Sequence, residues 1–330
     1  MKFAIISGAT GQDGSYLAEL LLEKEYTVHC IVRRSTRPIE ESNLTPGVIN
    51  HPNSHFHTAD LTDQPSLKKI FDIFTKEDYI EVYNLGAQSH VGVSFECPIS
   101  TVEINTIGTL NLLECAKEFP NVRFYQASTS EMFGKVHEVP QKETTPFHPR
   151  SPYGVAKMAA HWMVKNYRET YGMFTSCGIL FNHESPRRGD NFVTQKIIKG
   201  VKRVIEDETF VLELGNLESM RDWGHAKDYV YAMWMMLQQD TPDDYVVSMG
   251  ESYSVRHFVT CAFNYHKAEF RWAGDKGYIN GREVVRVSPK FYRPCEVDQL
   301  LGDSSKIRAL GWKPQFSFSQ LVEDMAANSS

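Results

Sequence analysis

Short apolar runs alternate with amphipathic stretches through the first half of the chain. The runs have strand length and lie near residues 2–7, 27–32, 55–58, 80–84, 122–127 and 176–181. Between them, apolar residues recur at three- and four-residue spacing, which predicts helices near 14–24, 64–75, 98–118 and 152–171. Strands that alternate with helices in this order favour a parallel sheet covered on both faces. The sequence therefore predicts an α/β fold with a doubly wound parallel Rossmann sheet of six strands.

The pattern changes after Phe181. Irregular segments rich in Arg, Gly, Asn and Pro are mixed with helical patterns near 192–205, 226–238, 255–266 and 318–326. No flexible linker separates the two parts, so we expect a smaller C-terminal α/β lobe that packs directly on the sheet. Residues 1–181 are predicted to form a dinucleotide-binding Rossmann domain, with later segments crossing back, and residues 182–330 mainly a ligand-binding lobe.

Composition and charge narrow the range of partners. The chain has 330 residues, of which 42% are hydrophobic and 23% charged, as is typical of a globular protein. A formal charge of -6 and a pI near 6.1 argue against a nucleic-acid-binding surface, which needs a basic excess. No stretch approaches the roughly 20 apolar residues that span a bilayer. We therefore expect neither nucleic acid nor membrane as a partner.

The cysteines and the N-terminus indicate where the protein works. Six cysteines lie far apart, without a C-x-x-C pair or matching histidine spacing, so neither a metal site nor a disulfide framework is predicted. The first apolar run reaches Gly8 too soon to be the core of a signal peptide. These features predict reduced thiols and a cytoplasmic location.

A glycine-rich turn follows the first predicted strand and precedes the first predicted helix. It comprises Gly8, Ala9, Thr10, Gly11, Gln12, Asp13 and Gly14. Glycines permit a tight turn and close backbone approach, and the N-terminus of the helix offers free N–H groups to a pyrophosphate. Glycine turns also occur without a ligand, but this position, at the first junction of a βαβ pattern, predicts dinucleotide binding.

The end of the second predicted strand indicates which dinucleotide is bound. A protein that prefers NAD usually has an acidic residue there, to accept a hydrogen bond from the ribose hydroxyl. This strand ends instead in Arg33, Arg34 and Ser35. Arg33 and Ser35 suit the 2′-phosphate of NADP, although a solvated basic loop would look the same. Further cofactor contacts are predicted after the third and fourth strands, at Asp60, Leu61, Leu85, Gly86, Ala87, Gln88 and Ser89.

A second group of residues has the spacing of a catalytic site. Thr129 ends the fifth predicted strand, and Tyr153 and Lys157 follow on a predicted helix. Positions i and i+4 share one helix face, so the Lys157 ammonium is expected to lower the pKa of Tyr153 toward neutrality. Tyr153 could then take a proton from a substrate hydroxyl, and Thr129 would share the hydrogen bond to that hydroxyl. Alone, this spacing is often only a surface pair.

Together, the three glycines, Ser128-Thr129 and Tyr153-x-x-x-Lys157 resemble the extended short-chain dehydrogenase/reductase superfamily. These marks do not separate epimerases, dehydratases and reductases. Glu131, two positions after Thr129, favours a 4,6-dehydratase, because that reaction needs a base for the C5 proton and an acid for the departing C6 hydroxyl. A structural role for Glu131, as a charge at a helix N-terminus or in a loop ion pair, is the alternative.

A closer resemblance covers nearly the whole chain. The segments 129–134, 182–189, 191–194 and 221–226 are similar to those of the GDP-mannose 4,6-dehydratase family. The resemblance implies a lyase that converts GDP-mannose to GDP-4-keto-6-deoxymannose, a precursor of deoxyhexoses, by internal hydride transfer through bound NADP. It also implies a homodimer or homotetramer. A second activity, NADPH-dependent reduction of the 4-keto product, is a further expectation.

The resemblance also assigns site residues. It places Ser100, Tyr153, Lys157, His183 and Arg188 at the cofactor. It places the substrate against Ser89, Ser130, Glu131, Asn182, Arg187, Asn191, Val193, Lys196, Asn216, Arg221, Arg293 and Glu296. Two features depart from the family pattern. Residues 33–40 lack the Ser- and Asn-rich segment expected after the arginine pair, and Ser100 stands where relatives often have tyrosine.

Two other functions fit part of the pattern. An epimerase or reductase acting on another nucleotide sugar would use Tyr153 and Lys157 but leave Glu131 idle. A dinucleotide-sensing binding protein that has abandoned catalysis would need no catalytic residues. The intact Thr129, Tyr153 and Lys157 argue against this function.

Overall fold

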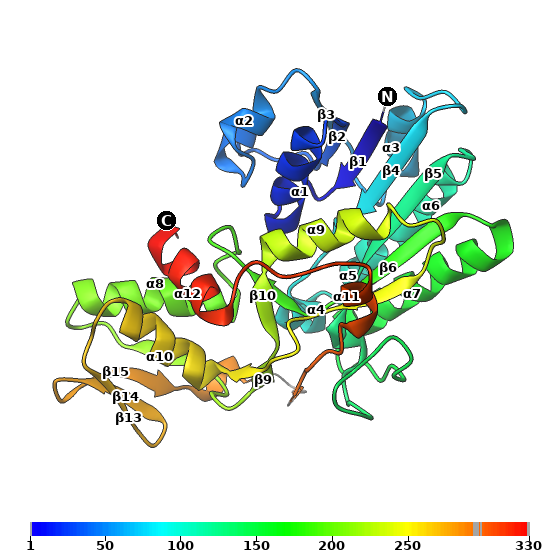
Figure 1. The fold of residues 1–330 in the computed structure, drawn as a ribbon. Helices are drawn as coiled ribbons and strands as arrows, with labels where there is room; N and C mark the ends of the chain where they lie inside the picture. The colour runs from blue at the N-terminus through cyan, green and yellow to red at the C-terminus, as the bar shows by residue number, and fades with distance from the viewer. Residues whose placement is uncertain (1, 293–296, 298, 329–330) are drawn as a thin grey trace.

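A computed structural model describes residues 2–292, 297 and 299–328, and its centre is a seven-stranded sheet in the order β11-β6-β5-β4-β1-β2-β3 (Figure 1). All of its strand pairs are parallel. The strands are β1 (Lys2–Ser7), β2 (Thr27–Val32), β3 (Ser54–Thr58), β4 (Tyr79–Asn84), β5 (Val122–Thr129), β6 (Phe174–Leu180) and β11 (Asp244–Val247). The α/β doubly wound fold is confirmed, and so are the six predicted strands. The expected strand number was wrong, because β11 returns from the second half of the chain to pair with β6.

Helices cover both faces of the sheet and bury a separate apolar cluster on each face. One face is covered by α1 (Gln12–Glu23) and α9 (Ala226–Met236), and the other by α3 (Gln64–Phe71), α6 (Gly108–Ala116) and α7 (Pro152–Tyr171). The helix predicted over 98–118 is divided into α5 (Pro98–Val102), a π-helical turn at Glu103–Ile107 and α6. Shorter helices are α2 (Pro46–Ile49), α4 (Val91–Glu96), α11 (Ser305–Ala309) and the 3-10 turns η1 (Ile39–Glu41), η3 (Ser130–Met132) and η4 (Pro289–Phe291).

The smaller lobe has an apolar cluster of its own and lies at one end of the sheet (Figure 1). Its helices are α8 (Val193–Glu206), α10 (Val255–Tyr265) and α12 (Phe318–Asn328), and its sheet has the order β13-β14-β15-β8. These strands are β8 (Leu212–Leu214), β13 (Phe270–Ala273), β14 (Lys276–Ile279) and β15 (Arg282–Val287). Two short pairs stand between the lobe and the sheet: β7 (Asn182–Glu184) with β10 (Trp223–His225), and β9 (Met220–Arg221) with β12 (Tyr253–Ser254). No helix in the described part of the chain is long and apolar enough to cross a membrane.

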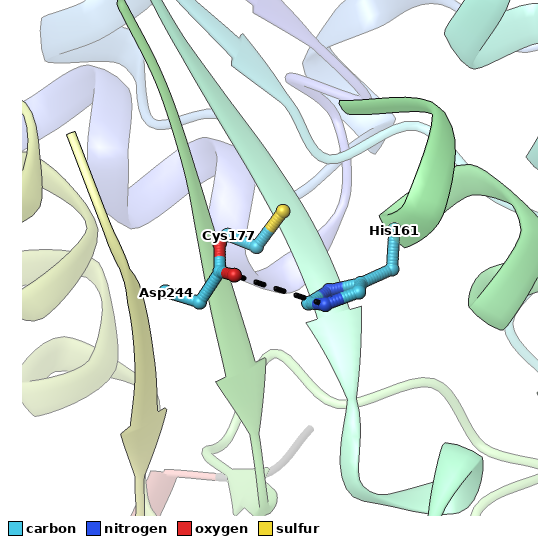
Figure 2. A group of neighbouring side chains, drawn as sticks. All are labelled: His161, Cys177 and Asp244. Atoms are coloured by element: carbon cyan, nitrogen blue, oxygen red, sulfur yellow. Dashed lines mark ion pairs between the residues drawn. The ribbon is translucent and has the colours of Figure 1, made fainter. Parts of the chain in front are cut away.

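A buried polar cluster joins α7 to the far edge of the sheet. Figure 2 shows its centre, where His161 from α7, Cys177 from β6 and Asp244 from β11 face one another. The Asp244 carboxylate accepts from Arg168 Nη2 at 2.5 Å and pairs with Lys165 Nζ at 3.3 Å. Each oxygen of the Asp244 carboxylate is therefore paired with a cationic side chain. Burial holds the pKa of the Cys177 thiol well above its ordinary value. The cluster thus acts as a polar clamp between α7 and β11.

Replacing Asp244 should test this clamp. Asp244→Asn would leave two cations beside a neutral amide, so we expect the free energy of unfolding to fall by about 3 kcal/mol, as for other broken buried ion pairs. Asp72→Asn, in the exposed Lys68–Asp72 pair, is the matched control and should cost less than about 1 kcal/mol in the same urea denaturation.

The difference in unfolding free energy between the wild type and Asp244→Asn should also depend on pH. Burial alone would raise the pKa of Asp244, but the hydrogen bond and charge of Arg168 lower it below its ordinary value. The carboxylate therefore stabilises the protein above the unfolded-state pKa, and that contribution is lost as the pH falls through the folded-state pKa. A wild-type advantage that does not shrink in acid would contradict this account.

Candidate active site

A cleft of about 1010 Å³ runs along the carboxyl ends of β1, β2, β4, β5 and β6 and continues into the lobe. Ligands in doubly wound folds bind at this edge, because the loops after parallel strands converge there. The cleft is lined by residues from both halves of the chain. The fold therefore brings the two groups of residues picked out in the sequence to one place.

The glycine turn after β1 is shaped for a close ligand. Gly8 has a φ of +70°, and a Cβ there would lie 2.8 Å from the backbone N of Gly86. A Cβ on Gly14 would lie 2.3 Å from Gly8 O. The N-terminus of α1 has no side-chain cap, so the N–H groups of its first turn face the cleft unprotected. This arrangement fits a pyrophosphate.

Most of the predicted cofactor and substrate residues line this cleft. They are Gly8, Thr10, Gly11, Gln12, Asp13, Gly14, Arg33, Asp60, Leu61, Leu85, Gly86, Ala87, Gln88, Ser89, Thr129, Ser130, Glu131, Tyr153, Lys157, Asn182, His183, Arg188, Asn191, Val193, Lys196, Asn216 and Arg221. Their roles stay predictions. Arg293 and Glu296 lie outside the described residues.

Four described residues from the prediction are absent from the cleft lining: Ala9, Ser35, Ser100 and Arg187. Ala9 is fully buried in the apolar core, and Ser35 and Ser100 are exposed. The Arg187 guanidinium donates to Ser15 Oγ at 3.0 Å and to Glu19 Oε1 at 2.7 Å. Its charge is therefore used to hold the loop after β7 against α1.

The predicted catalytic residues converge from three elements. Thr129 ends β5, Glu131 lies in η3, and Tyr153 and Lys157 share one face of α7. All four are at least nine-tenths buried and line the cleft. Thr129 Oγ1 accepts a hydrogen bond from Glu131 N at 3.2 Å, so the strand end and the acidic residue are locked together.

The expected effect of Lys157 on Tyr153 is not found in the protein alone. Burial raises the pKa of Tyr153 to about 12, and its hydrogen bond with Thr129 offsets only part of the rise. Burial also lowers the pKa of Lys157 to about 8, and Lys157 Nζ donates to Ala127 O at 2.8 Å. The i, i+4 geometry was right, but the sequence could not show how strongly both groups are desolvated.

The segment after β6 forms the opposite wall. Asn182 Oδ1 is buried and has no hydrogen-bond partner among the described residues, which is costly unless a ligand donates to it. Glu184 Oε2 lies 3.0 Å from Arg188 Nε and accepts from Thr194 Oγ1 at 2.6 Å. Arg188 also lies over the ring of Phe192, 3.6 Å from its centre.

Comparison with known proteins gives this arrangement a family. The family model described as GDP-mannose 4,6 dehydratase matches residues 5–325. The chain belongs to the GDP-mannose 4,6 dehydratase family. GDP-mannose 4,6 dehydratases of Drosophila melanogaster and Homo sapiens are 52% and 50% identical to it; each alignment covers 98% of this chain, and they cover 85% and 90% of those proteins. That of Yersinia enterocolitica is 48% identical over 99% of this chain and 93% of its own length.

Solved structures show the same fold in more distant enzymes. A UDP-glucose 4-epimerase of Thermus thermophilus in complex with NAD has a TM-score of 0.83 at 24% identity, covering 99% of this chain and 98% of its own. A dTDP-glucose 4,6-dehydratase of Bacillus anthracis, also in complex with NAD, has a TM-score of 0.80 at 20% identity, covering 99% and 96%. The GDP-mannose 4,6 dehydratase family thus shares its architecture with both epimerases and dehydratases.

Within this family site, the sequence analysis missed several lining residues. Lys290 and Phe291 stand beside Lys196, whose ammonium lies 3.1 Å from the centre of the Phe291 ring. His90 also lines the cleft; its Nδ1 accepts from Val93 N at 3.1 Å, and its Nε2 lies 3.2 Å from Asn191 O. The only sequence signal for these residues was position, next to Ser89 and just before Arg293.

Proposed function

We propose that this protein removes water from GDP-mannose to give GDP-4-keto-6-deoxymannose, using a bound nicotinamide dinucleotide that is regenerated in every turnover. Membership of the family supports the reaction and the substrate. The observation that carries the dehydratase reading is Glu131, which is buried in the cleft beside Thr129 and Tyr153. An epimerase would have no use for a carboxylate there.

The first step is oxidation of the sugar at C4. Tyr153 takes the proton of the C4 hydroxyl, and Thr129 shares that hydrogen bond. A dinucleotide bound at the glycine turn would supply the hydride acceptor for C4 and the hydride donor for C6. Because the pKa of Tyr153 is about 12 in the protein alone, the ammonium of Lys157 and the oxidised nicotinamide must together lower it for Tyr153 to act as a base.

Glu131 carries the elimination. Once C4 is a ketone, the C5 proton becomes acidic, and Glu131 removes it. The same carboxyl then protonates the departing C6 hydroxyl, which leaves as water. A single group suffices for the elimination because the proton taken from C5 is the one delivered to that oxygen. When hydride has been added to C6, C5 takes up one proton, which balances the proton that Tyr153 removed from the C4 hydroxyl.

The remaining residues divide between the two ligands. Residues 1–181 mainly hold the dinucleotide, and residues 182–330 mainly hold the nucleotide sugar. Lys196 and Arg221 offer positive charge to the substrate diphosphate, together with Arg293, while Asn182 and Glu296 bind hydroxyl groups. The five described cysteines are all free thiols, which supports a cytoplasmic setting.

Glu131→Gln should separate the two half-reactions. With GDP-mannose the variant should still reduce its bound dinucleotide but lose water about 10²- to 10⁴-fold more slowly, since only the acid–base group is removed. Absorbance of the reduced dinucleotide and mass spectrometry of the sugar give the two readouts, with Tyr153→Phe as the control that stops before reduction.

The substrate is tested in the same assay. Wild-type protein should dehydrate GDP-mannose but neither dTDP-glucose nor UDP-glucose. Full water loss by Glu131→Gln would overturn the dehydratase mechanism, and water loss from another nucleotide sugar would overturn the substrate. Added NADPH tests the weaker second activity, reduction of the 4-keto product to a deoxyhexose.

NADP is the proposed form of the dinucleotide. Arg33 and Arg34 both follow β2 and are exposed, but only Arg33 is among the residues that line the cleft. Arg33→Ala should weaken NADP binding about ten- to hundredfold, the value of a charged hydrogen-bonded contact, and leave NAD binding unchanged. Arg34→Ala is the matched control in a fluorescence titration. Equal losses for NADP and NAD would show that Arg33 does not read the 2′-phosphate.

We also propose that two copies associate through an apolar surface on α5 and α7. Ile99 is 74% exposed and Trp162 52% exposed, and both belong to this surface with Val102, Val155 and Met163. Exposed apolar residues gathered on adjacent helices mark an association surface, and a twofold axis would pair the surface with itself. A homotetramer would need a second contact, for which residues 33–40 are the candidate.

Trp162→Glu should therefore yield a monomer, because it places a charge in the paired apolar surface. Light scattering after size-exclusion chromatography measures the mass directly. Tyr265→Glu, at a 40% exposed aromatic on α10, is the control and should leave the mass unchanged. A Trp162→Glu protein of unaltered mass would rule this surface out.

A further inference from the structure

His183 faces the cleft with both of its ring nitrogens committed. Nδ1 lies 2.8 Å from the carbonyl oxygen of Phe181, and Nε2 lies 2.8 Å from Oδ2 of Asp13. A carbonyl oxygen and a carboxylate oxygen only accept hydrogen bonds. A neutral imidazole has one N–H and can satisfy one of them, whereas an imidazolium satisfies both.

The surroundings of Asp13 keep its carboxylate ionised. Ser185 Oγ accepts from Arg187 N at 3.1 Å, so its own proton is free to go to Gln12 Oε1 at 2.8 Å. The amide of Gln12 is thereby oriented, and its Nε2 donates to Asp13 Oδ1 at 3.0 Å. The donor at Asp13 Oδ1 stabilises the ionised carboxylate, which favours placing the proton of the Oδ2–Nε2 contact on the ring of His183.

Charged or titratable groups from three elements surround the His183 ring. Asp13 approaches from α1, Arg188 from the loop after β7, and Tyr229 from α9, its ring stacked on that of His183 at 4.6 Å. Burial and Arg188 would lower the pKa of His183, but the charge and hydrogen bond of Asp13 raise it above its ordinary 6.5. Burial would likewise raise the pKa of Asp13, yet His183 brings it below its ordinary value.

The pair also lies at the reacting end of the cleft. The negative charge of Asp13 opposes the loss of a proton from both Tyr153 and Lys157. A dinucleotide that exchanges hydride beside Tyr153 must place its nicotinamide near these groups. That ring is a cation when oxidised and neutral when reduced, so a fixed charge close to it shifts the balance between the two forms.

We propose that His183 is an imidazolium held by Asp13, and that this charge pair sets the relative affinity of the site for oxidised and reduced dinucleotide. The second half of the proposal rests on the proposed function; the first does not. In this arrangement His183 disfavours the oxidised nicotinamide and Asp13 compensates for it. The site then binds neither the oxidised nor the reduced dinucleotide much more tightly than the other. A reaction that transfers hydride to the dinucleotide and back again requires this balance.

The charge is tested first, without any ligand. Nuclear magnetic resonance of protein labelled with ¹⁵N in its histidine rings separates the imidazolium from the neutral tautomers. At about pH 7, above the ordinary histidine pKa, both nitrogens of His183 should be protonated in the wild type. In Asp13→Asn the ring should be neutral. A neutral ring in the wild type would refute the proposal.

The effect on the cofactor is tested by binding. His183→Gln leaves the Asp13 charge uncompensated, so the Kd of NADP⁺ divided by that of NADPH should fall about tenfold. The double variant Asp13→Asn/His183→Gln removes both charges and should restore the wild-type ratio. His137→Gln, at an exposed histidine that does not line the cleft, is the control and should leave the ratio unchanged.

Each outcome bears on one part of the proposal. A charged ring with an unaltered binding ratio in His183→Gln would overturn the role in cofactor balance and keep the charge assignment. Neither measurement uses a sugar substrate, so a failure of the dehydratase proposal would leave both readouts intact.

Discussion

The backbones after β1 and β4 approach so closely that a side chain is excluded at Gly8, where a Cβ would lie 2.8 Å from the backbone N of Gly86. Gly14 repeats the constraint one turn into α1, against the carbonyl of Gly8. This contact aims the N-terminus of α1 along the cleft and fixes Asp13 and Gln12 at its floor. The partners of those two side chains, His183 and Ser185, belong to the segment after β6. The glycine turn therefore organises both walls of the cleft.

The helix α7 connects chemistry with stability. Its first two turns carry Tyr153 and Lys157 into the cleft, and about one turn after Lys157, His161 joins the polar clamp around Asp244. His161 Nδ1 also lies 3.0 Å from Oγ of Ser128, the neighbour of Thr129. The clamp and the proposed catalytic residues are thus connected through the same helix and through β5, so disorder at the clamp would displace Tyr153, Lys157 and Thr129.

The sequence predicted what depends on local pattern. Six strands alternate with amphipathic helical stretches, and the glycine turn and Tyr153-x-x-x-Lys157 have fixed spacing. Features that depend on residues far apart in the sequence were not predicted. The strand β11 is only four residues long and forms because the edge of β6 is free to pair. The hydrogen bonds of Arg187 to Ser15 and Glu19 join residues more than 160 positions apart, so the sequence pattern did not indicate them. The raised pKa of Tyr153 comes from burial by several elements, which no local pattern encodes.

The late return of β11 has a consequence for how the protein is made. Ribosomal synthesis delivers β1 to β6 first, but the sheet stays incomplete until α8 and α9 have also emerged. In the interval β6 is an open edge of the kind that pairs with other chains. Residues 1–181 therefore do not complete the central sheet without β11. A chain that ends after β6 would expose that edge permanently and should be prone to aggregate through it.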